Sequence, residues 1–175
     1  MLLRSFASFA CSLLLATSTL AQAGRPVPSP AETATASLNG KSVTVKYGAP
    51  SMRGRKIMGE LVPYGKVWRT GANEATSLVT DANLTIGGKP VPAGSYTLYT
   101  LPEASQWLLI VNKQTGQWGT NYDQSQDLIR VPMKSGKFAS PQEKMSITFE
   151  NTSGNSTELH VKWENTDESV TVTAQ

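Results

Sequence analysis

The charged residues that could do chemistry are concentrated in one stretch, residues 50–76. Cations outnumber anions there, on a backbone interrupted by glycines: Arg53, Arg55, Lys56, Lys66 and Arg69 stand against Glu60 and Glu74. Arginine binds carboxylate or phosphate groups through paired hydrogen bonds, so this excess predicts an anionic ligand. The alternative is that Arg55 or Arg69 pairs with one of the two glutamates and pins a loop that lacks ladder hydrogen bonds.

Aromatic and amide side chains accompany these charges in two irregular segments, 50–76 and 115–126. Aromatic rings beside polar groups on loops suit a sugar or a glycan-like polymer. Trp68 also fits a plug that seals one end of the fold, because aromatic side chains bury large areas, and Trp118 is open to the same two interpretations. The candidate ligand-binding residues are Arg53, Arg55, Tyr64, Trp68, Arg69, Asn73, Glu74, Trp118 and Tyr122.

Catalysis is a weaker hypothesis. Glu60 and Glu74 could form the carboxylate pair of a hydrolase acting on an envelope or glycan-type substrate. Pairing with arginine lowers the pKa of a carboxylate, however, whereas a general acid needs a raised pKa. His160 is the only histidine, and its alternation with Leu159 and Val161 places it on an exposed strand face. Neither a Ser-His-Asp triad nor a zinc site is expected, and no metal or cofactor is predicted.

The first residues have the form of a secretory signal peptide. Arg4 is the only charge among the first 24 residues, an apolar run follows it, and the run ends at Ala21-Gln22-Ala23. These are the parts of an export signal cleaved after Ala23. The only cysteine, Cys11, lies inside the apolar run, with Ser8 where a lipoprotein signal would have leucine. We therefore expect an exported protein, periplasmic or extracellular, without a stable membrane span after cleavage.

Residues 24–34 form a proline-rich leader, which we expect to act as a spacer before a single domain over residues 35–175. Cleavage after Ala23 leaves 15 basic and 13 acidic residues. This near-neutral balance argues against a nucleic-acid partner, which would require a strongly basic surface. The partners that fit are a small molecule, a glycan or an envelope protein.

Strand patterns cover most of the chain. Residues 42–47, 145–150 and 159–164 alternate between apolar and polar side chains, which is typical of half-buried strands. Residues 95–101 and 106–112 are apolar on both faces and predict central strands.

Turn residues punctuate these strands. Gly87-Gly88 predicts a two-residue hairpin, and Pro132 places a strand at a sheet edge. Residues 152–155 predict a second hairpin tip, and the one place where the pattern allows helix is a single turn around residues 56–62. The fold class predicted is all-β: an antiparallel β-sandwich or flattened barrel of about nine or ten short strands with one long ordered loop.

Several strings resemble one known family, DUF2911. The resemblance rests on residues 47–51 (YGAPS), 53–57 (RGRKI), 59–65 (GELVPYG), 67–76 (VWRTGANEAT), 92–98 (PAGSYTL), 107–112, 118–119 and 127–131. It spans nearly the whole chain after the leader. It implies an exported bacterial domain of unknown function and carries over no catalytic residues.

We therefore predict a noncatalytic β-sandwich that binds a ligand or partner through segments 50–76 and 115–126. The hydrolase using Glu60 or Glu74 is the first alternative. A purely structural envelope protein is the second.

Overall fold

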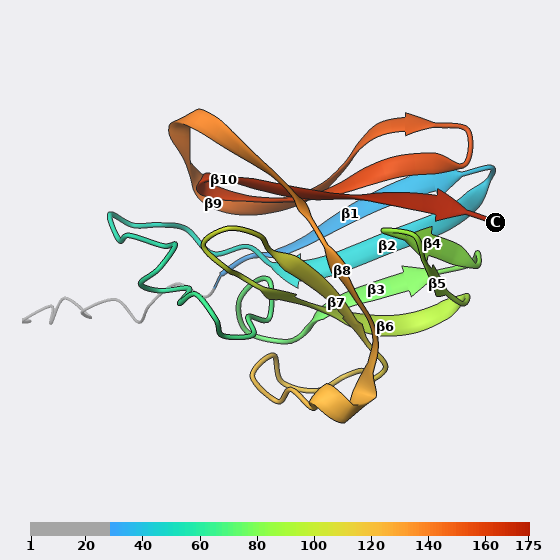
Figure 1. Ribbon diagram of the computed structural model, residues 1–175, viewed down its shortest axis with the longest axis horizontal. Helices are drawn as coiled ribbons and strands as arrows, with labels where there is room; N and C mark the ends of the chain where they lie inside the picture. The colour runs from blue at the N-terminus through green and yellow to red at the C-terminus, as the bar shows by residue number, and fades with distance from the viewer. Residues whose placement is uncertain (1–28) are drawn as a thin grey trace, which may run out of the picture.

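The structure, a computed structural model, describes residues 29–175 and is a two-layer antiparallel β-sandwich (Figure 1). The predicted signal peptide (1–23) and the start of the predicted leader lie outside the described residues. The strands are β1 (Ala31–Leu38), β2 (Lys41–Gly48), β3 (Thr76–Thr80), β4 (Leu84–Ile86), β5 (Lys89–Val91), β6 (Gly94–Leu101), β7 (Leu108–Asn112), β8 (Asp127–Pro132), β9 (Lys134–Ser153) and β10 (Ser156–Ala174). A short 3-10 helix, η1, spans Gln124–Gln126. No helix within residues 29–175 is long and apolar enough to cross a membrane.

The two sheets have separate strand orders. One holds six strands in the order β1-β2-β3-β6-β7-β8, and the other holds four in the order β5-β4-β10-β9. They do not close on each other, so the β-sandwich prediction is confirmed and the flattened barrel is excluded. β6 and β7 are interior and buried on both faces, and β8, which ends at Pro132, lies at an edge, as the sequence predicts. The Gly87-Gly88 hairpin is also present, with both glycines at positive φ.

Three expectations need correction. β1 begins at Ala31, so residues 31–34 of the predicted leader belong to the fold and pair with β2. Residues 56–62 form turns and a bridge between Met58 and Val62, with no helical turn. β9 and β10 are not short: they contain 20 and 19 residues and pair along their lengths through register shifts.

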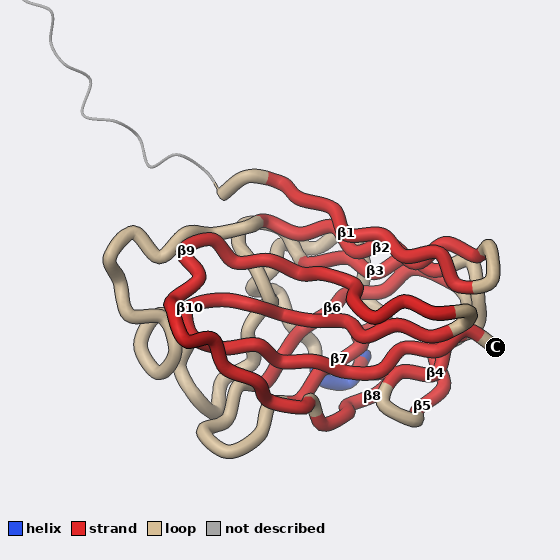
Figure 2. The backbone as a smooth tube through the Cα atoms, turned by 90° about the horizontal axis from the view of Figure 1, so that it is seen from above, coloured by secondary structure: helices blue, strands red, loops and turns tan. Residues whose placement is uncertain are grey.

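The core lies between the sheets. Val43, Val45 and Tyr47 on β2 point inward, as the alternation predicts, and Leu159 and Trp163 of β10 are buried in the same apolar cluster. The loop between β2 and β3, teal to green in Figure 1, lies at the end of the sandwich away from the C-terminus, where Figure 2 shows the long loops gathered. The fold therefore presents this loop at one end of a rigid scaffold.

Candidate functional site

The loop of residues 50–76 is ordered because it inserts side chains into the core. Ile57 and Val62 are buried with exposures of 0% and 1%. Trp68 is half-buried and stacks on Trp163, with ring centroids 5.9 Å apart, and meets Trp107 edge-on at 6.3 Å. Full burial of an aliphatic side chain contributes about 1.5–3 kcal/mol. These anchors hold the loop down without regular secondary structure.

Hydrogen bonds to distant strands replace the ladder that the loop lacks. The Glu164 carboxylate on β10 accepts from the backbone N–H groups of Ile57 and Met58 at 3.2 and 3.0 Å. Trp68 exchanges two backbone hydrogen bonds with Thr100 of β6 at 2.8 and 2.9 Å. Backbone donors that would otherwise be unpaired are thus satisfied on both sides of the loop.

Segment 115–126 lies against the outer face of β6. The Gln117 amide nitrogen donates to Tyr99 Oη at 3.2 Å. Tyr122 packs edge-on against Tyr99 and donates to Asp127 Oδ2 at 2.7 Å, and Arg130 donates to Tyr122 Oη at 2.6 Å. Burial, followed by the bond to Asp127, raises the pKa of Tyr122 to about 12. The Tyr122 hydroxyl is hydrogen-bonded to both Asp127 and Arg130, so this side chain holds segment 115–126 against β8.

The two segments meet at Arg69. The stretch around Glu74 forms an isolated β-bridge with Trp118, and the Gly119 N–H donates to the Asn73 carbonyl oxygen at 3.3 Å. A Cβ atom on Gly119 would lie 2.3 Å from Arg69 Cδ and 2.9 Å from the Asn73 carbonyl oxygen. Glycine is therefore required for segment 115–126 to pack against the Arg69 side chain.

Beside this junction lies a solvent-open cleft of about 540 Å³. We call it the arginine cleft, and its walls come mostly from the loop: Ser29, Pro50, Ser51, Arg53, Arg55, Leu61, Val62, Trp68, Arg69, Gly71, Ala72, Asn73 and Trp163. Three arginines line it, and no aspartate or glutamate is among its lining residues. The lining is therefore cationic, and the half-buried Trp68, stacked on the buried Trp163, forms its aromatic wall.

The hydrogen bonding of the cleft arginines differs. Arg55 donates to the main-chain carbonyl oxygens of Ser51 and Met52 at 2.8 and 2.9 Å, which carry no formal charge. Arg69 Nε is buried and has no hydrogen-bond partner within the described chain. Burying such a donor unpaired costs about 1–3 kcal/mol, more when it is charged. Arg69 is thus the group in the cleft with the strongest need for an acceptor.

The expected internal ion pairs are not formed. Glu60 is exposed and pairs with Lys56 at 3.4 Å, four residues away on the same turn. Within residues 29–175, neither Arg55 nor Arg69 forms an ion pair with Glu60 or Glu74. The hypothesis that arginine pins the loop through these glutamates is wrong, since apolar anchors and Glu164 do so instead.

The structure brings five of the nine candidate residues into the arginine cleft: Arg53, Arg55, Trp68, Arg69 and Asn73. Tyr64 is 46% exposed and lies against Gly59 outside the cleft, and Trp118 is 52% exposed beside the junction. Glu74 lines a second, adjacent cleft, and Glu60 lines neither of the two. The two glutamates therefore do not share a cavity in which a carboxylate pair could act.

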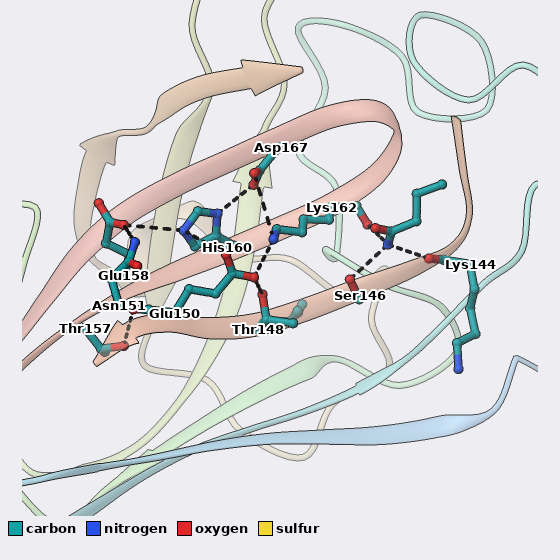
Figure 3. A network of polar contacts seen from close by, with 12 residues as sticks. Lys144, Ser146, Thr148, Glu150, Asn151, Thr157, Glu158, His160, Lys162 and Asp167 are labelled. Carbon is teal, nitrogen blue, oxygen red and sulfur yellow. Dashed lines mark hydrogen bonds and ion pairs between the residues drawn. The ribbon is translucent and has the colours of Figure 1, made fainter. Parts of the chain in front are cut away.

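His160 corrects a further expectation, because its side chain is only 12% exposed. Figure 3 shows the ring between Asp167 and Glu158. His160 does lie on the outer face of β10, but the strand bends after Lys162 and returns Asp167 over it. His160 Nδ1 lies 2.7 Å from Asp167 Oδ1, and Nε2 lies 3.7 and 3.8 Å from carboxylate oxygens of Glu158 and Glu150. Lys162 pairs with Glu150 in the same cluster. Among the described residues, no group of three or more His, Cys, Asp or Glu side chains could hold a metal ion.

Sequence reasoning missed three residues that shape the site. Glu164 follows an alternating strand pattern, and nothing in that pattern indicates that its carboxylate caps a loop 106 residues away. The alternation of residues 159–164 places Trp163 on the inward face of a strand, but its stacking on Trp68 depends on the tertiary fold. Gly119 carries a weak signal, because glycine is often found where the backbone is closely approached by other atoms.

Fold and cleft together define the class of protein. It is an antiparallel β-sandwich whose longest loop lines a cationic cleft with an aromatic wall at one end. Residues 29–172 match the family model DUF2911, described as a protein of unknown function. The chain belongs to this family, which confirms the resemblance seen in the sequence. No curated protein and no solved structure matches the chain.

Proposed function

We propose that this protein is a noncatalytic binding protein that holds a small anion, or an acidic group of a glycan, in the arginine cleft. The observation that carries the proposal is Arg69: its Nε is buried and unpartnered within the described chain, in a cleft lined by three arginines and no carboxylate. A carboxylate or phosphate oxygen in the cleft is the natural partner for the Arg69 guanidinium, which no carboxylate of the described chain neutralises. The half-buried Trp68, stacked on the buried Trp163, adds an apolar surface beside the charge, against which a sugar ring can pack.

The hydrolase alternative has less support. Paired-carboxylate hydrolysis requires two carboxyl groups about 5–10 Å apart that face one substrate. Glu60 lies outside both clefts and is bound to Lys56, and Glu74 lines a different cleft from the arginines. The purely structural alternative predicts that changes in the loop alter thermal stability and nothing else.

The predicted signal peptide supports a ligand outside the cytoplasm. The charge of Arg4, the apolar run after it and Ala21-Gln22-Ala23 are the parts of a signal peptide, and no cysteine follows Cys11. The binding role proposed here is therefore periplasmic or extracellular, and the candidate ligands are anionic small molecules or acidic envelope glycans. An envelope protein that presents an acidic group to the cleft has the same chemistry.

Titration with matched probes tests the proposal. Phosphate tests for a simple anion, and glucuronate with glucose as the neutral control tests for an acidic sugar, each followed by NMR chemical shifts. Charge-assisted hydrogen bonds contribute about 1.5–3 kcal/mol, so Arg69→Met should weaken binding of phosphate or glucuronate about tenfold or more. Lys89→Met removes the same charge from the exposed β4–β5 hairpin and should leave affinity unchanged.

The outcomes separate the hypotheses. Equal affinities for glucuronate and glucose, with no binding of phosphate, would exclude an anion site. Equal losses of anion affinity in Arg69→Met and Lys89→Met would show that binding depends only on the net charge of the protein. A change in melting temperature in Arg69→Met, with no anion bound by the native protein, would favour the structural alternative.

A further inference from the structure

A second cleft adjoins the arginine cleft and shares its wall. It has a volume of about 320 Å³ and is lined by Ser29, Ala31, Glu32, Thr33, Lys46, Tyr47, Gly48, Ala72, Asn73, Glu74, Ala75 and Ser77. Ser29, Ala72 and Asn73 line both clefts. The Asn73 amide donates to the Ser29 carbonyl oxygen at 3.2 Å, so a hydrogen bond closes the wall between them.

This wall is built to a fixed geometry. Asn73 adopts a left-handed backbone conformation with φ 66°, and the Ala72 N–H donates to the Gly48 carbonyl oxygen at 3.1 Å. A Cβ on Gly48 would lie 2.3 Å from the Ala72 carbonyl oxygen, so the loop lies directly against the end of β2. The two clefts are therefore adjacent and are separated by a wall of fixed backbone geometry.

The clefts differ in charge. The arginine cleft contributes three cations and no carboxylate, whereas the second cleft has Glu32 and Glu74 against a single cation, Lys46. Glu32 already pairs with Lys144 at 2.7 Å. Glu74 is exposed and, within the part of the chain described, forms no ion pair, while its backbone bridge to Trp118 fixes its place. Glu74 thus has a fixed backbone position, and its carboxylate can accept a cationic group of a ligand.

We propose that the two clefts form one bipartite site for a zwitterionic ligand, with its anionic group beside Arg69 and an ammonium group beside Glu74. This inference rests on the proposed function of the arginine cleft and adds the class of ligand. An ammonium group is repelled by the three arginines and attracted by Glu74, so a ligand that carries both charges binds in one orientation. A dianion of the same length meets Glu74 with the wrong sign.

The probes are straight-chain ω-amino carboxylates of about four to eight carbons, each compared with the monocarboxylate of equal length. The series covers a range of separations between the two charges, so the separation that fits the two clefts need not be known in advance. Affinities are measured by NMR titration of the full mature chain. Exposed ion pairs contribute about 0.2–1 kcal/mol, so at the best-fitting length the amino compound should bind up to about fivefold tighter.

Three variants show which side chains cause the preference for the amino compound. Glu74→Gln should abolish the preference for the amino compound and leave the affinity for the plain carboxylate unchanged. Glu60→Gln removes an exposed carboxylate outside both clefts and should retain the preference. Arg69→Met should weaken both compounds together, because both place a carboxylate in the arginine cleft.

The result separates this inference from the proposed function. If plain carboxylates bind in an Arg69-dependent way and the amino group gives no advantage at any length, the bipartite site is refuted and the anion cleft stands. Persistence of the preference in Glu74→Gln also refutes the bipartite site. If no carboxylate of the series binds, and phosphate and glucuronate fail as well, both proposals fall.

Discussion

Gly119→Ala should disturb the site through a single methyl group. The added Cβ would lie 2.3 Å from Arg69 Cδ and 2.9 Å from the Asn73 carbonyl oxygen. Carbon atoms in contact are separated by about 3.5–4.0 Å, so the Arg69 side chain or segment 115–126 must move by about 1 Å or more. Forcing an extra methyl into such a contact costs about 1–3 kcal/mol.

Both stability and binding should respond. For a domain of this size, 1 kcal/mol shifts the melting temperature by about 2–4 °C, so Gly119→Ala should melt about 2–12 °C below the native protein. Anion affinity should fall as well, because a shift of the Arg69 side chain changes the lining of the arginine cleft. Differential scanning calorimetry and phosphate titration measure the two effects.

Gly116→Ala is the matched control. Gly116 belongs to the same segment, but a Cβ there would meet no atom within 4 Å, and only the strain of its φ of 77° is added. It should lower stability by about 1–2 kcal/mol without changing anion affinity. A Gly119→Ala protein with native melting temperature and native affinity would refute the packing of Arg69 described above.

Two further predictions concern the scaffold. Burial raises the pKa of Glu168 from 4.5 to about 6, although the hydrogen bond from Ser135 acts in the opposite direction. The protonated carboxyl therefore stabilises the fold below pH 4.5, and this stability is lost as the pH rises through 6. In urea unfolding curves Glu168→Gln should equal the native protein at pH 4 and exceed its free energy of unfolding at pH 8 by at most about 2 kcal/mol. Glu164→Ala leaves the Ile57 and Met58 N–H groups without their acceptor, at about 1–3 kcal/mol each. Limited trypsin digestion should then cut the loop between residues 53 and 66 while the native loop resists, and equal resistance of the two proteins would contradict the anchoring role.

The parts of the fold that were predictable rest on local rules. Gly87-Gly88 forms the expected hairpin because positive φ at both positions is a property of the turn itself. Pro132 ends an edge strand because its missing N–H is unsuited to a central one. Such signals are complete within a few residues, so no knowledge of the rest of the chain is required.

The features that were missed depend on distant contacts. β1 begins at Ala31 with alanine and threonine, a weak apolar pattern that becomes a strand because β2 supplies its hydrogen-bond partners. His160 has the outward phase of a surface residue, but a bend in β10 brings Asp167 over it. The loop glutamates looked like partners for the arginines on composition, whereas the fold assigns anchoring to Glu164.

Backbone strain in the loop favours binding over a purely structural role. Thr70 has φ 53°, a costly conformation for a β-branched residue. It persists because Thr70 Oγ1 bonds Thr100 Oγ1 at 3.1 Å and the Thr70 carbonyl accepts from Thr76 Oγ1 at 2.9 Å, all three threonines being buried. A loop that only sealed the sandwich would need its apolar anchors, yet the strained residue directly follows Arg69. The buried hydrogen bonds of the loop therefore hold the backbone next to Arg69 in the wall of the cleft, which is the arrangement expected where local strain serves a binding site.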